Sequence, residues 1–289
     1  MRTARARALA IVIMIGLVLA GGCAAAVRRL PSGSVPASYW TRSRLLAATP
    51  LLPGGSRVPL PGQPENARAA LLALRVGALF IRYGGDDHFC TASVVDSPGR
   101  DLLITAAHCI SGGKGGGYRQ DIVFIPDYRD GVAPFGIWTA RRLLVAPQWS
   151  RYSNPGLDVG FVVLGPHDGR NIEDVLGANR LRFDPPYRQL VRVTGYPDSG
   201  DAPITCRNWT TRWSATQLRF QCGGYANGTS GSPWVTDFDP RTQTGTIVGV
   251  IGGYQEGGDT ASVSYSSYLG QDVLRLYREA AAAGASPAA

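Results

Sequence analysis

Charged residues are scarce in this chain, and those present are not gathered in one place. Only 17% of the 289 residues are charged while 44% are hydrophobic, which excludes a chain that is disordered throughout and leaves enough apolar material for a well-buried core. Basic residues outnumber acidic ones by 29 to 21, yet the arginines are scattered rather than collected in a basic stripe. This distribution argues against nucleic acid as a partner.

The N-terminus carries a basic stretch followed by a long uncharged run. Arg2, Arg5 and Arg7 precede an uncharged stretch from Ala8 to Val27, which is the pattern of an export signal that we assign to residues 1–22. The same stretch is long enough to be an uncleaved membrane-spanning helix. Both interpretations predict that the rest of the chain is extracytoplasmic, as a cell-surface or a secreted protein.

Cysteine is also sparse, with five residues in the chain. Cys23 follows Ala20-Gly21-Gly22, which resembles the lipobox of bacterial lipoproteins, although Ala20 stands where leucine is usual. The other four can form two disulfides in an oxidising compartment, which leaves Cys23 free for lipidation. These four are Cys90, Cys109, Cys206 and Cys222. The alternative is that Cys23 belongs to a discarded peptide or to a spanning helix.

The remaining sequence divides into three parts. Residues 23–70 are rich in Pro, Ser, Gly, Ala and Arg without periodicity, which is typical of a linker, here lipid-attached, or of a removable pro-segment. Residues 71–280 contain the globular domain. Residues 281–289 are mostly alanine, and we expect a disordered tail.

Short apolar runs bounded by Gly, Pro, Asp and Asn recur through the domain and predict an all-β fold. The predicted strands are Val76–Tyr83, Thr91–Asp96, Leu102–Thr105, Ile122–Ile125, Ile137–Ala146, Val159–Leu164, Leu190–Tyr196, Gln217–Cys222, Pro233–Thr236, Thr246–Tyr254 and Ser262–Tyr265. They form two halves, divided near residues 170–188, which the pattern alone allows to be barrels or sandwiches. A helix is predicted at Gly270–Ala282, with apolar residues on one face.

The segment Gly228-Thr229-Ser230-Gly231-Ser232-Pro233 is the strongest chemical feature. Small residues around Ser230 let the backbone turn sharply, so that the hydroxyl projects and the amides of Gly228 and Ser230 can point at one spot. Such amides would stabilise the oxyanion of a tetrahedral intermediate. Taken alone, the segment also fits an ordinary turn.

A serine nucleophile needs a base, and the chain has only three histidines. His108 directly follows an apolar run and is the candidate base, whereas His88 and His167 have polar neighbours that indicate loop residues. Asp158 is the only acid in an otherwise apolar segment, where it could hold the imidazole in one tautomer. Its alternative role is a simple strand-start acid.

Together these three segments resemble the trypsin/chymotrypsin-like serine peptidases. They share the order His, Asp, Ser, with Thr-Ala-Ala-His-Cys at His108, Asp-Val-Gly-Phe-Val-Val-Leu from Asp158 and Gly-Thr-Ser-Gly-Ser-Pro at Ser230. The Thr-Ser-Gly-Ser-Pro-Trp form is closer to the bacterial branch that includes glutamyl endopeptidases. The resemblance covers Arg75 to Ala280 and implies two six-stranded antiparallel barrels with the active site between them.

The resemblance also implies the pairing of the cysteines. It pairs Cys90 with Cys109 beside His108, which leaves Cys206 with Cys222. A competing arrangement is a zinc site built from His88, Cys90, His108 and Cys109, since these ligand types suit zinc. Exported thiols tend to pair, so we expect disulfides, no metal and no cofactor.

Two departures from the family concern activation and specificity. Thr229 replaces the aspartate that pairs with a new N-terminus in trypsin, and residues 223–229 contain no carboxylate for basic substrates. Ile251 replaces the histidine expected for glutamate specificity, so a neutral pocket fits better. The resemblance predicts Tyr225, Ile251, Gly252 and Gly253 as substrate-binding residues, the last three as a strand that pairs with the substrate backbone.

We therefore expect a secreted or surface-anchored, monomeric serine endopeptidase that acts on polypeptides through an acyl-enzyme. Two alternatives use the same fold. The first is a catalytically silent binding module, because a fold does not ensure a function. The second is an esterase with the same three residues.

Overall fold

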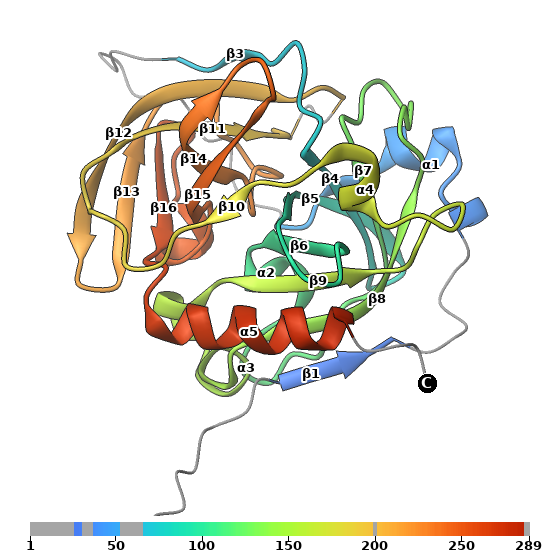
Figure 1. Ribbon diagram of the computed structural model, residues 1–289, viewed down its shortest axis with the longest axis horizontal. Helices are drawn as coiled ribbons and strands as arrows, with labels where there is room; N and C mark the ends of the chain where they lie inside the picture. Colours follow the sequence, from blue (N-terminus) through green and yellow to red (C-terminus); the bar gives the residue numbers. More distant parts are fainter. Residues whose placement is uncertain (1–25, 31–36, 53–65, 199–200, 286–289) are drawn as a thin grey trace, which may run out of the picture.

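The computed structural model describes residues 26–30, 37–52, 66–198 and 201–285. These residues form two β-sheet bodies side by side, with a long C-terminal helix across one of them (Figure 1). The architecture is the predicted all-β fold of two barrels with a C-terminal helix.

The first barrel is a closed ring of six antiparallel strands. The strands are β4 (Val76–Tyr83), β5 (Asp86–Val95), β6 (Leu102–Thr105), β7 (Gln120–Pro126), β8 (Trp138–Val145) and β9 (Gly160–Leu164). The ring runs β4-β5-β6-β9-β8-β7 and returns to β4. Leu79, Phe124 and Leu143 are 0% exposed in its core, as expected where alternate side chains of each strand fill a barrel.

The second barrel also has six main strands, but its backbone ladder stays open at one seam. The strands are β11 (Leu190–Gly195), β12 (Ile204–Ser214), β13 (Gln217–Gln221), β14 (Pro233–Asp239), β15 (Thr244–Val250) and β16 (Val263–Ser267). They pair in the order β15-β14-β11-β12-β13-β16. At the seam the Val250 amide donates to Ser266 Oγ at 2.9 Å, so that a side chain takes the place of a backbone acceptor.

Short elements complete the molecule. Four short strands lie at the edges: β1 (Ala26–Arg29), β2 (Thr49–Pro50), β3 (Arg68–Ala69) and β10 (Arg180–Leu181). The short helices are η1 (Ala37–Tyr39), α1 (Arg42–Ala47), α2 (Ala107–Ile110), α3 (Pro147–Tyr152), η2 (Pro155–Leu157), α4 (Ile172–Leu176) and η3 (Tyr254–Gly257). The chain passes from the first barrel to the second through α4 and β10. β10 already belongs to the second sheet, where it pairs with β15.

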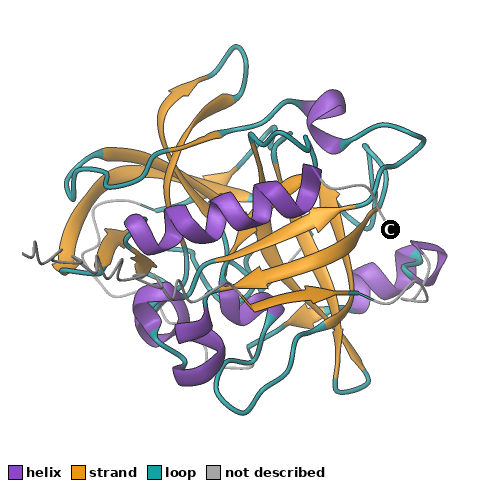
Figure 2. Ribbon diagram, turned by 60° about the horizontal axis from the view of Figure 1, so that its bottom comes forward, coloured by secondary structure: helices purple, strands orange, loops and turns teal. Residues whose placement is uncertain are grey.

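The C-terminal helix α5 (Gln271–Ala285) lies across strands of the first barrel (Figure 2). Its buried face includes Val273 and Leu276. The prediction of a disordered tail from residue 281 is wrong as far as Ala285. The helix continues because Ala281 is buried against the barrel and the Arg142 side chain donates to the Ala283 carbonyl.

Part of the segment predicted as a linker or pro-segment is folded onto the first barrel. Trp40 is 2% exposed, and its ring lies 5.6 Å from that of Phe80. Leu45 and Leu51 are buried as well, and the Leu51 amide donates to the Phe89 carbonyl at 3.1 Å. A loose spacer is therefore the wrong description of residues 37–52, because their apolar side chains complete the barrel surface.

The predicted signal, residues 1–22, and the predicted lipidation site Cys23 lie outside the described residues. Within the described ranges, no helix combines the length and apolarity needed to cross a membrane.

Candidate active site

His108 and Asp158 form a buried pair between the two barrels. His108 Nδ1 donates to Asp158 Oδ2 at 2.8 Å, and the His108 amide donates to Asp158 Oδ1 at 2.9 Å. The two side chains are 2% and 0% exposed. A third donor comes from the second barrel, where the Gly253 amide reaches Asp158 Oδ2 at 2.8 Å. The carboxylate therefore fixes the imidazole in the tautomer that leaves Nε2 as the acceptor.

Local structure on both sides holds this pair. β6 ends at Thr105, and the single turn of α2 that follows carries His108 next to strand β9. Cys109 forms a disulfide with Cys90 on β5, with an S–S distance of 2.07 Å. Asp158 follows η2, whose first turn is capped by Asn154. Each polar residue thus sits where a regular element ends, within a rigid frame.

The pair changes the acidity of His108. Burial favours the neutral ring, but the charge of Asp158 and its hydrogen bond outweigh burial, so the pKa of His108 is raised above its ordinary value. Glu256 adds a smaller contribution in the same direction, while Arg119 opposes it. In the described part of the chain, Nε2 is buried without a hydrogen-bond partner, so it is free to take a proton from another group.

The turn that carries Ser230 connects β13 to β14. It needs glycine at two positions, because Gly228 and Gly231 have φ angles of 89° and 85°. A Cβ added at Gly231 would lie 2.0 Å from the Thr91 carbonyl oxygen and 3.2 Å from the Ala106 nitrogen. The turn therefore packs directly against the segment that leads into His108.

Thr91 on β5 ties the Ser230 turn to the first barrel. Its amide donates to the Ser230 carbonyl at 2.8 Å, and its hydroxyl donates to the Gly228 carbonyl at 3.1 Å. Its own carbonyl accepts from Thr105 Oγ1 at 2.8 Å. These bonds hold the turn and the His108 segment on one frame, although within the described residues no hydrogen bond joins the Ser230 hydroxyl to His108 Nε2.

The two amides predicted as oxyanion donors, those of Gly228 and Ser230, differ from the neighbouring amides in their hydrogen bonding. The amides of Thr229, Gly231 and Ser232 donate to carbonyl groups within the protein. For Gly228 and Ser230, no amide hydrogen bond occurs among residues 66–198 and 201–285. Within those residues these two amides thus have no acceptor, as an oxyanion site requires.

The predicted substrate-binding residues differ in burial and in whether their polar groups already have partners. Tyr225 is fully buried and its hydroxyl donates to the Val193 carbonyl at 2.8 Å, so assigning its side chain to substrate binding is wrong. It fills the core of the second barrel, because its ring packs against Phe220. Ile251 is also buried, at 1% exposed, and both of its backbone groups bond to the Gly231–Ser232 segment.

Gly252 and Gly253 follow at the edge of the site. Their amides donate to the Tyr265 carbonyl and to Asp158, respectively. The Gly253 carbonyl accepts from the Glu256 amide at 3.0 Å. Across the described residues, only the Gly252 carbonyl of this stretch has no partner. The predicted strand therefore offers a substrate one acceptor rather than a full ladder.

The four remaining cysteines form the two expected disulfides. Cys206 and Cys222 are joined at 1.96 Å in the second barrel. Sγ of Cys90 and Cys109 and a ring nitrogen of His108 lie within 4.8 Å of one another, but the disulfide leaves no thiolate to bind zinc. His88 lies on strand β5 rather than in the predicted loop. Its Nδ1 is hydrogen-bonded to Thr49 Oγ1 at 3.2 Å. His167 lies in a turn with Arg170.

Several contributors to the site were not predicted. Thr91, the Gly253 amide and Glu256 act on the turn or on the His108–Asp158 pair. Only Thr91 carries a sequence signal, since it follows Cys90. The Gly253 amide is a backbone group, and the influence of Glu256 depends on how η3 folds.

Comparisons with known proteins identify solved structures of similar fold but no sequence relative. Neither a scan of protein-family models nor a search of curated proteins found a match. Among solved structures, the chain is similar to the protease Anisep from Arthrobacter nicotinovorans, with 26% identity and a TM-score of 0.68 over 75% of this chain and 99% of that one.

Two further structures are similar over a comparable share of the chain. The thermostable serine protease AL20 from an extremophilic microorganism has 24% identity and a TM-score of 0.66, covering 74% of this chain and 99% of that one. A Glu endopeptidase in complex with MPD has 16% identity and a TM-score of 0.61, covering 75% and 97%. The chain thus has the trypsin-like double-barrel fold, and the solved structures that it resembles are bacterial trypsin-like serine proteases.

Proposed function

We propose that this protein is a serine endopeptidase that cleaves polypeptides through a Ser230 acyl-enzyme. The observation that carries the proposal is the buried His108–Asp158 pair, whose Nε2 lacks a partner beside the glycine-flanked Ser230 turn. Serine proteases as structural neighbours support protease activity in general terms.

In the proposed mechanism, Ser230 Oγ attacks the carbonyl carbon of the scissile peptide bond. His108 Nε2 takes the hydroxyl proton, and Asp158 stabilises the resulting imidazolium. The Gly228 and Ser230 amides donate to the oxyanion. As the C–N bond breaks, His108 returns the proton to the leaving amine. Water, deprotonated by the same imidazole, then hydrolyses the acyl-enzyme and releases Ser230.

Substrate alignment is proposed to use the Gly252 carbonyl. It is the free acceptor next to the Asp158-bound Gly253 amide, so it can accept the amide of the residue before the scissile bond. Residues 223–229, the segment before Ser230 that would line the specificity pocket, contain no carboxylate. We therefore propose that this pocket prefers uncharged substrate side chains.

We also propose an extracytoplasmic location, with attachment through Cys23 or free secretion. The two disulfides support an oxidising compartment. The apolar N-terminal sequence supports export.

The test of the proposed function is Ser230→Ala. Peptide hydrolysis should fall by roughly a million-fold, the scale seen when a catalytic triad loses its nucleophile. An unchanged circular dichroism spectrum controls for folding. Undiminished hydrolysis by the folded variant would refute the proposal, and an inactive wild-type protein would favour the binding module.

A further inference from the structure

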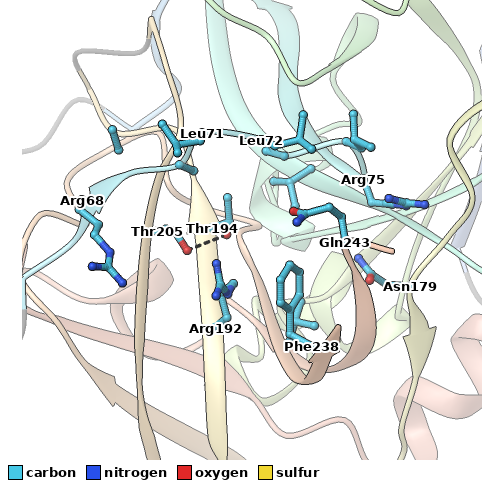
Figure 3. Close-up of a pocket in the computed structure, with 16 residues that line it drawn as sticks. Arg68, Leu71, Leu72, Arg75, Asn179, Arg192, Thr194, Thr205, Phe238 and Gln243 are labelled. Atoms are coloured by element: carbon cyan, nitrogen blue, oxygen red, sulfur yellow. Dashed lines mark hydrogen bonds between the residues drawn. The ribbon is translucent and has the colours of Figure 1, made fainter. Parts of the chain in front are cut away.

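A cavity lies outside the candidate active site. It is located between the segment that leads into the first barrel and the outer face of the second barrel. Its volume is about 540 Å³, and residues 68–76 form one wall while β11, β12 and β14 form the other (Figure 3). Asn179, near the crossover, closes one end. None of its lining residues belongs to the His108, Asp158 and Ser230 site.

All charged residues that line this cavity are basic. Three arginines, Arg68, Arg75 and Arg192, line it together with thirteen uncharged residues, so no carboxylate faces them. Arg192 on β11 pairs directly with Arg207 on β12. Arg68 on β3 pairs with Thr205, two positions from Arg207 on the same face of β12. Like charges placed opposite each other across strands repel.

The arginines lack internal counterions. Across the described residues, none of Arg68, Arg75 and Arg192 forms a salt bridge. Nε of Arg75 and of Arg192 is buried without an acceptor. Burial, followed by the charges of Arg207 and Arg68, lowers the pKa of Arg192. Arg75 donates to the Thr242 carbonyl at 2.6 Å, but within the described residues no carboxylate balances the positive charge in the cavity.

An acid in a neighbouring cavity does not supply the missing charge. Asp237 lines a neighbouring cavity of about 390 Å³ that shares Arg192 with the first. Its carboxylate is already paired with Arg182 at 2.9 Å. Among the described residues, Arg192 thus has no carboxylate partner that would compete with an external anion.

Both walls of the cavity also carry apolar side chains. The Arg192 guanidinium lies 4.3 Å from the centre of the Phe238 ring, and Val235 continues this surface. Leu72 lines the opposite wall with 44% of its surface exposed. Figure 3 shows the Arg192 guanidinium between the Phe238 ring and Thr194, on the cavity side of β11.

We propose that this cavity binds a small organic anion, with a carboxylate or phosphate group on an apolar body. A guanidinium presents a planar fork of donors that matches both oxyanions. The cavity volume is within the range of small-molecule sites, and such sites combine apolar walls with a few polar anchors. The anionic group would contact Arg192 and Arg68, and the apolar body would lie against Phe238 and Leu72.

The test is isothermal titration of the purified protein with four probes. Octanoate and octyl phosphate carry both features, inorganic phosphate lacks the apolar body, and octyl glucoside lacks the charge. Saturable binding of octanoate or octyl phosphate, at least tenfold tighter than that of the other two, is expected. The tighter of the two amphipathic probes identifies the headgroup, carboxylate or phosphate. Equal binding of octyl glucoside, or no binding of either amphipathic probe, would overturn the assignment.

Two variants locate the site. Arg192→Gln should weaken binding of the amphipathic probe at least tenfold, and Arg68→Gln, at an exposed position on β3, should weaken it without disturbing the sheet. Arg278→Gln, on α5 outside the cavity, removes the same charge and should leave binding unchanged. Equal affinity in all three variants would show that the probe binds elsewhere. The readout is independent of peptide hydrolysis, so its outcome does not depend on the proposed function.

Discussion

At the scale of single residues, the Asp158 carboxylate is held by three hydrogen bonds. Its two oxygens accept from the His108 amide, from His108 Nδ1 and from the Gly253 amide, at 2.8–2.9 Å. A buried carboxylate is stable only when its lone pairs are satisfied. Because one donor comes from the second barrel, the orientation of the imidazole depends on both halves of the fold.

The raised pKa of His108 sets the pH dependence of the proposed reaction. The imidazole must be neutral to act as base, so kcat/KM should fall with decreasing pH around a midpoint above the ordinary histidine value of about 6.5.

Glu256→Gln removes a charge that raises this pKa, so the acid limb of the kcat/KM profile should move to lower pH. Asp272→Asn, which removes a carboxylate paired with Arg275 on α5, should not move it. A Glu256→Gln profile that coincides with wild type would contradict the assigned electrostatics.

At the scale of elements, the Ser230 turn depends on close backbone contact between the barrels. Gly231 combines a positive φ with a Cβ position that would overlap the Thr91 carbonyl and Thr105 Oγ1. Replacing it with alanine must move the turn away from β5.

Gly231→Ala should therefore lower the free energy of unfolding by about 2–4 kcal/mol, through strain and overpacking, and should reduce kcat/KM as the turn moves. Gly117→Ala, where an added Cβ meets nothing within 4 Å, should change the free energy by less than about 0.5 kcal/mol. Urea denaturation followed by tryptophan fluorescence measures both. Equal stability of the two variants would show that the turn tolerates displacement.

The elements themselves were largely predictable from pattern. β4 and β6 have the predicted bounds, and α5 begins one residue later than expected. β12 was missed, because its arginines and exposed residues hide the alternation that Ile204 and Cys206 begin. The triad candidates were identifiable because each lies in a local motif. Tyr225 was misassigned, because sequence alone does not tell whether a side chain beside a cleft faces the core.

At the scale of the whole molecule, the N-terminal segment is joined to both barrels. Residues 37–52 cover the first barrel through Trp40, Leu45 and Leu51. The Ala67 amide donates to the Gly223 carbonyl of the second barrel at 2.8 Å. None of this packing was predictable, because isolated apolar residues in a Pro-rich and Gly-rich segment show no period.

Trp40→Ala should lower the free energy of unfolding by about 3–5 kcal/mol if this segment remains part of the folded protein. Trp209→Ala, at a position 46% exposed, provides the same substitution on the surface and should cost less than half as much. Chemical denaturation of the purified variants measures both values. Unchanged stability for Trp40→Ala would show that the segment is not part of the stable fold, as expected of a removable pro-segment.

The central claim is that His108 activates Ser230. The most direct measurement is labelling of the folded protein with a fluorophosphonate probe, followed by mass spectrometry of the labelled peptide. The account predicts a single adduct on Ser230 that forms far more slowly in a folded His108→Ala variant. Wild-type protein that stays unlabelled, or labelling of Ser230 at the same rate without His108, would contradict it.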